Sequence, residues 1–65
     1  MMLQEALKYE NILKQYCKEY NFCSINLNTA VDVYVTTKNL KEMKKYINFK
    51  RIEKLKGHRH YLLTF

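Results

Sequence analysis

The spacing of apolar residues changes once in the first half of the chain, and this change constrains the fold more than any other feature. Over residues 2–20 the apolar side chains recur every three or four positions, which is typical of a helix with one buried face. From Cys23 onward they recur at every second position, which is typical of a half-buried strand. The pattern predicts a helix that ends near Asn21, followed by a β-hairpin.

The predicted hairpin turns at Asn28-Thr29. The side chains predicted to share its buried face alternate along both strands: Cys23, Ile25, Leu27, Val31, Val33 and Val35. Because the turn contains no glycine, the sequence leaves the turn type open.

The second half of the chain repeats this order of helix and hairpin. Thr37 or Asn39 is expected to cap a helix, and Glu42 follows Asn39 at the spacing of a capping box. The apolar stripe of this helix consists of Leu40, Met43 and Ile47. The helix is predicted to end near Tyr46 or Ile47.

Residues 49–65 are predicted to form a second hairpin around Lys56-Gly57, because glycine adopts turn conformations that other residues avoid. Tyr61, Leu63 and Phe65 alternate regularly after this turn. The apolar residues before it do not share one period-two face, so a bulge or an irregular start is expected there.

These elements predict an α+β fold in a single domain over residues 1–65, with the order α-β-β-α-β-β. The most economical packing is one antiparallel sheet with both helices on its apolar face. The opposite face of the sheet is then expected to carry Tyr34, Thr36 and several of the C-terminal basic residues.

Composition indicates a folded chain that stays in the cytoplasm. Hydrophobic residues make up 48% of it, more than disordered chains contain. A chain of 65 residues has a small core, so a partner, or a homodimer formed through strand edges, could supply part of its stability. No apolar run approaches the roughly 20 residues that span a bilayer, and no signal peptide is evident, so no membrane partner is expected.

Two cysteines, Cys17 and Cys23, are expected to be reduced thiols that pack as small hydrophobic residues. The alternative is a zinc site formed with His58 and His60. The five residues between the cysteines exceed the spacing of a zinc knuckle, so neither a metal nor a cofactor is expected.

Charge divides the chain into two unlike halves. Residues 1–32 carry three lysines against four carboxylates, whereas residues 33–65 carry nine basic residues against two carboxylates. The net charge of +6 therefore comes from the second half, and this asymmetry predicts an anionic partner.

The predicted binding residues are the basic side chains of the second half together with two tyrosines that could stack on unpaired bases. They are Lys38, Lys41, Lys44, Lys45, Lys50, Arg51, Lys54, Lys56, Arg59, Tyr34 and Tyr46. We expect a small basic protein that is not an enzyme and binds nucleic-acid phosphates without sequence specificity, in a salt-sensitive manner. Lysines that merely solubilise the helix face are the alternative interpretation.

A second function class stays open beside nucleic-acid binding. Ten lysines against two arginines, with six asparagines, indicate an AT-rich coding sequence of the kind found in phages and mobile elements. A chain this small could be an inhibitor, similar to an anti-CRISPR protein, that uses the same residues to bind an acidic surface of a host protein. Such binding would depend on a few exposed side chains rather than on the lysines as a group.

A third function is implied by a resemblance over Leu40–Tyr61. Its helix, its strand, the turn Lys56-Gly57 and its histidine-rich strand resemble the start of HicA-type toxins, which are small RNases with a double-stranded-RNA-binding-like fold. In that family a serine and then the catalytic histidine follow the glycine, and here His58 and Arg59 stand at those positions. The first 37 residues have no counterpart in the family, and its remaining strand and closing helix have none here. This resemblance makes an RNase toxin the most distant alternative.

Overall fold

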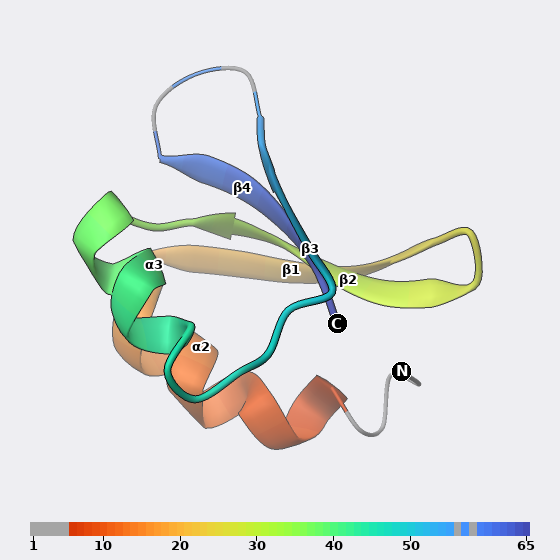
Figure 1. Cartoon of the computed structure of the whole chain (residues 1–65), viewed down its shortest axis with the longest axis horizontal. Helices are drawn as coiled ribbons and strands as arrows, with labels where there is room; N and C mark the ends of the chain where they lie inside the picture. Colours follow the sequence, from red (N-terminus) through yellow and green to blue (C-terminus); the bar gives the residue numbers. More distant parts are fainter. Residues whose placement is uncertain (1–5, 56, 58) are drawn as a thin grey trace.

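The computed structural model describes residues 6–55, 57 and 59–65 and has the predicted α+β fold (Figure 1). Along the chain it contains η1 (Leu7–Tyr9), α2 (Glu10–Tyr16), β1 (Glu19–Ile25), β2 (Asn28–Tyr34), α3 (Thr37–Met43), β3 (Arg51–Lys54) and β4 (His60–Thr64). The strands form one antiparallel sheet in the order β1-β2-β4-β3. Both helices cover the same face of this sheet, as the sequence predicted.

The first helix is shorter than predicted. It ends at Tyr16, because Cys17 adopts an extended backbone with φ −101° and ψ 138°. The predicted helix over residues 17–20 is therefore wrong, and Asn21 lies within β1 instead of ending a helix. Residues 1–5 of the predicted helix lie outside the described residues.

The first hairpin turns two residues earlier than predicted. Asn26 and Leu27 form its turn with φ of 50° and 67°, and Ile25 pairs directly with Asn28. This register places Tyr20 opposite Val33 and Phe22 opposite Val31, so both aromatic rings lie on the helix-covered face.

The predicted burial of Cys23, Ile25 and Leu27 is wrong, since all three are exposed. Tyr20 and Phe22, on the other face of β1, pack partly buried against the core instead.

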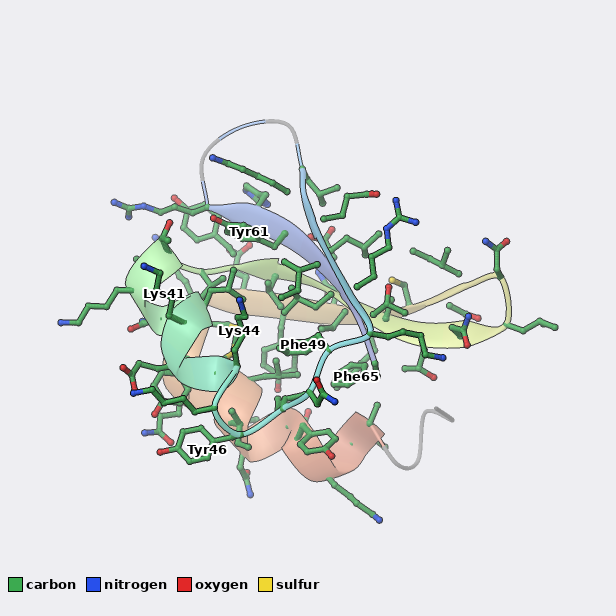
Figure 2. The ribbon with its side chains drawn as sticks, in the orientation of Figure 1. Lys41, Lys44, Tyr46, Phe49, Tyr61 and Phe65 are labelled. Atoms are coloured by element: carbon green, nitrogen blue, oxygen red, sulfur yellow. The ribbon has the colours of Figure 1, made fainter. Side chains whose placement is uncertain are left out.

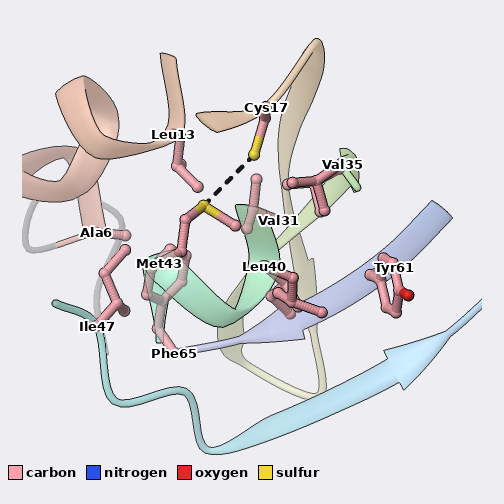
Figure 3. Packing of buried hydrophobic residues seen from close by; sticks show 12 residues of the cluster. Ala6, Leu13, Cys17, Val31, Val35, Leu40, Met43, Ile47, Tyr61 and Phe65 are labelled. Atoms are coloured by element: carbon pink, nitrogen blue, oxygen red, sulfur yellow. Dashed lines mark hydrogen bonds between the residues drawn. The ribbon is translucent and has the colours of Figure 1, made fainter. Parts of the chain in front are cut away.

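The core lies between the sheet and the two helices (Figure 3). Val31, Val33 and Val35 are buried on β2 and directly after it, which confirms the alternation read from the sequence. Tyr61, Leu63 and Phe65 are buried along β4 and at its end, also as predicted. Leu13 of α2 and Met43 of α3 are fully buried, so the helices cover the centre of the sheet.

α3 begins at a different cap from the one predicted. The Thr36 hydroxyl accepts a hydrogen bond from the Asn39 backbone N–H at 3.1 Å, so Thr36 is the N-cap and the proposed Asn39-Glu42 capping box is absent. The Asn39 side chain instead donates to the Tyr16 carbonyl oxygen at 3.1 Å and so ties α3 to the end of α2. Leu40, Met43 and Ile47 are buried, which confirms the predicted stripe.

The irregular start predicted for the second hairpin lies at Lys50 and Arg51. Arg51 is in register with Thr64, yet the Lys50 backbone N–H also donates to the Thr64 carbonyl oxygen at 2.7 Å. Two residues therefore face one, as in a bulge. Gly57 has φ 101°, in accord with its predicted turn role, while Lys56 and His58 lie outside the described residues.

Candidate nucleic-acid interface

Three lysines project from the exposed side of α3. Lys38, Lys41 and Lys44 follow one another at three-residue steps, so they lie as neighbours along the helix surface. All three are exposed, and none has a carboxylate oxygen within 4.0 Å among the described residues. Figure 2 shows Lys41 and Lys44 extending from α3 on the side of the molecule that carries Tyr61.

One further lysine lies on the same side of the molecule, at β3. Lys54 is the register partner of Tyr61, so its side chain lies on the helix-covered face of the sheet. Lys50 is exposed directly before β3, at the bulge, where the alternation of the strand is interrupted. The helices leave the β3 edge uncovered, since Ile52 is 37% exposed.

Tyr61 lies between the lysines of α3 and Lys54. Its hydroxyl lies 3.4 Å from the Thr37 hydroxyl at the start of α3, while its strand position pairs with Lys54. We call the four exposed lysines on this side of the molecule the lysine surface: Lys38, Lys41, Lys44 and Lys54.

Two of the predicted cations are paired with carboxylates. The Lys45 ammonium lies 3.3 Å from the Glu42 carboxylate, and an Arg51 guanidinium nitrogen lies 2.8 Å from the Glu53 carboxylate. Arg51 also faces the opposite side of the sheet from the lysine surface, because the next residue, Ile52, pairs with the buried Leu63 and takes the helix side. Lys45 and Arg51 therefore add less positive potential to this surface than the sequence implied.

The open face of the sheet is not basic, contrary to the prediction. The register places Glu19, Asp32 and Glu53 there, and among the described strand residues Arg51 is the one lysine or arginine on that face. Tyr34 does lie on the open face, as predicted, but Thr36 caps α3 instead. The fold thus separates charge in a way that counting along the chain did not reveal.

Arg59 and Tyr34 lie together at one end of the sheet, since Tyr34 is in register with His60. The Val35 backbone N–H donates to the Arg59 carbonyl oxygen at 2.7 Å. The Tyr34 ring meets His60 edge-on, with 4.7 Å between ring centroids, and the Lys18 ammonium lies 5.7 Å from the Tyr34 centroid. Sequence analysis missed Lys18, because it precedes the basic half and no local pattern marks it.

Tyr46 follows the C-terminal end of α3. It is 60% exposed and stacks on Tyr16, with 6.4 Å between the ring centroids. Burial, followed by the neighbouring Tyr46, raises the pKa of the Tyr16 hydroxyl. Lys56, the remaining predicted binding residue, lies outside the described residues.

The two cysteines lie on opposite faces of the sheet, so they cannot share a metal ion. Cys17 is buried on the helix side, and burial raises the pKa of its thiol to about 11. Cys23 is exposed on the open face, where partial desolvation and then the Asp32 carboxylate raise the pKa of its thiol. Within residues 6–55, 57 and 59–65, no three His, Cys, Asp or Glu side chains are grouped as metal ligands.

No helix in the described part of the chain is long and apolar enough to cross a membrane. No protein-family model, curated protein or solved structure matches the chain.

Proposed function

We propose that this chain is a non-enzymatic protein that binds the phosphates of nucleic acids through the lysine surface. One observation carries the proposal. Among the described residues, four exposed lysines without a carboxylate oxygen within 4.0 Å lie on the helix-covered side of the molecule, while three of the six acidic residues of the chain lie on the opposite face of the sheet. Such separation focuses positive potential on one side, and a phosphate backbone needs little else for non-specific binding.

The chemistry of the surface predicts weak sequence preference. Lysine ammonium groups act as point charges and lack the forked geometry that lets arginine recognise a guanine edge with two hydrogen bonds. The lysine surface contains no arginine. Affinity should therefore follow the number of phosphates contacted and the salt concentration, with little dependence on base sequence.

A second candidate uses the same surface against a protein. Tyr46 is 60% exposed at the end of α3, and exposed aromatic side chains often supply much of the binding energy of a protein interface. An inhibitor that occupies an acidic surface of a host protein would therefore depend on Tyr46 together with the lysines. Nucleic-acid binding should tolerate Tyr46→Ala with a change in Kd below about twofold, so this substitution distinguishes the two candidates.

Fluorescence anisotropy with a labelled 12-nucleotide single strand and a 12-base-pair duplex tests the proposal. If all four lysines contact phosphates, raising salt from about 50 to about 200 mM should weaken binding roughly 150-fold. Lys41→Gln with Lys44→Gln should weaken binding at low salt and reduce the salt slope by about two. Lys45→Gln with Arg51→Gln removes the same charge from ion-paired positions and should have the smaller effect.

Two results would contradict the proposal. One is the absence of binding at about 50 mM salt, where phosphate contacts are strongest. The other is equal weakening by the two double variants, which would show that total charge matters and the lysine surface does not. Circular dichroism of each variant confirms that the fold is retained.

A further inference from the structure

A pocket of about 280 Å³ opens at the end of the sheet where α2, β2 and α3 meet. Its walls include Tyr16 at the end of α2, Lys18 from the segment that joins α2 to β1, Tyr34 from β2, Asn39 from α3, and Arg59. Two of these residues are cations, two are aromatic, and no described residue of the wall carries a carboxylate. This composition favours an anionic ligand that also has a flat ring.

The two cations are fixed on either side of the end of β2. The Lys18 backbone N–H donates to the Tyr34 carbonyl oxygen at 2.9 Å, and the Val35 N–H donates to the Arg59 carbonyl oxygen at 2.7 Å. Tyr34, the last residue of β2, therefore holds Lys18 on one side, and Val35 directly after it holds Arg59 on the other. Neighbouring strands are about 4.8 Å apart, so the two backbones are roughly 10 Å apart. Long cationic side chains can converge on a single phosphate across that distance.

The backbone at Arg59 supports a built site. Arg59 has φ 67°, a left-handed conformation that costs a residue other than glycine about 1 kcal/mol or more. The hydrogen bond from Val35 holds this conformation in place. A strained backbone of this kind persists where the surrounding structure holds it in place. At Arg59 the left-handed conformation sets the position of the second cation.

Polar groups beside the tyrosines could recognise a base edge. The Asn39 side-chain N–H₂ group bonds to the Tyr16 carbonyl oxygen, which leaves the amide oxygen of Asn39 able to accept from a ligand. Gln15 adds a second amide to the wall. The volume lies just below the range of about 300–1,000 Å³ that holds drug-sized molecules, so one base fits better than a larger ligand.

The pocket lies beside the start of α3. Thr36 and Asn39 line it, and Lys38 lies between them in the sequence. The start of α3 therefore contributes residues both to the pocket and to the lysine surface. Glu19 belongs to a neighbouring depression with Lys18, Tyr34 and His60, and not to this pocket.

We infer that the pocket binds one unpaired nucleotide of a single-stranded nucleic acid, with its phosphate between Lys18 and Arg59 and its base against the tyrosines. The inference deepens the proposed function and rests on it. It predicts a preference for single strands over duplexes, because a paired base cannot leave its stack without a cost of a few kcal/mol. It also predicts that the base itself contributes to affinity.

The test compares three probes of 12 nucleotides: a thymidine single strand, an abasic single strand and a duplex. The wild-type protein should bind the thymidine strand about tenfold more tightly than the abasic strand, as expected for one stacked base. Lys18→Gln with Arg59→Gln should abolish this difference and weaken single-strand binding by about tenfold or more. Lys8→Gln with Lys14→Gln removes the same charge outside the pocket and should preserve the difference.

Each outcome is decisive. Selective loss of thymidine-strand binding in the pocket variant supports the inference. Equal weakening of all three probes by both variants, or wild-type binding indifferent to the base, overturns the inference but leaves phosphate binding by the lysine surface intact. Absence of salt-sensitive binding to any probe overturns the proposed function, and the inference with it. Thermal unfolding of both double variants shows whether they fold.

Discussion

The Cys17 thiol points at the Met43 thioether, with 3.6 Å between the two sulfur atoms (Figure 3). This contact joins Cys17, the C-cap of α2, to Met43, the last residue of α3, and both side chains are buried. Sulfur is polarizable and both side chains adapt their shape, so the pair fills an irregular gap between helices and sheet. The stability of the fold should therefore be sensitive to changes at either residue.

Ionisation of Cys17 should make the protein less stable at high pH. Burial raises the pKa of this thiol to about 11 in the folded state, from an ordinary value of 9.0. Between these two pKa values the folded protein retains a proton that the unfolded chain loses. The contribution of the buried thiol to the free energy of unfolding is therefore fully present below about pH 9 and is lost as pH rises toward 11. Relative to Cys17→Val, the free energy of unfolding should fall by about 1 to 2 kcal/mol over that interval.

Urea denaturation at pH 8, 9, 10 and 11 measures this difference. Lysines, tyrosines and Cys23 titrate in both proteins, so subtracting the Cys17→Val series isolates the buried thiol. Parallel pH profiles for the two proteins would contradict the prediction.

Met43→Ala should lower the free energy of unfolding by about 2 to 5 kcal/mol, because it leaves a cavity in the centre of the core. Met43 is fully buried on α3, and in a 65-residue chain this loss is a large part of the total stability. Met43→Leu keeps a similar volume and should cost less than about 1.5 kcal/mol. Thermal unfolding followed by circular dichroism separates the two variants, and equal destabilisation would argue against the packing described.

Leu27→Gly should stabilise the protein by about 0.5 to 1 kcal/mol. Leu27 is 99% exposed and has φ 67°, so its side chain makes no packing contribution and strains the backbone. Asn-Gly is the favoured sequence for a two-residue turn with two positive φ angles. Leu27→Ala keeps the Cβ atom and should give no such gain. A fall in the urea midpoint of Leu27→Gly would show that the turn differs from the one described.

Thr36→Ala should destabilise the protein by about 1 kcal/mol, because it removes the oxygen that accepts the Asn39 backbone N–H. Thr36→Ser keeps that oxygen and should stay close to the wild type. Chemical denaturation of the pair tests the cap directly. Equal loss in both variants would indicate that the Thr36 methyl group, and not its hydroxyl, stabilises the start of α3.

The position of the first turn shows where local patterns failed. Cys23, Ile25 and Leu27 alternate as well as Tyr20 and Phe22 do, so alternation alone fits either register. Shifting a strand by one residue exchanges its two faces, and the choice depends on what the other strands and helices bury. The register of β1 therefore depends on the pairing of Phe22 with Val31, and the residues next to Phe22 in the sequence do not specify it.

The sequence by itself determined the element order, the buried faces of β2, α3 and β4, and the concentration of positive charge in the second half. These features depend on hydrophobic period and composition, which are local. Only the tertiary structure decided the register of β1, the pairing of Lys45 and Arg51 with carboxylates, and the place of the acidic residues on the open face. It also brought Lys18 and Arg59 to either side of Tyr34 and Val35. Contacts between distant segments arise from strand pairing, and no local pattern in the chain specifies them.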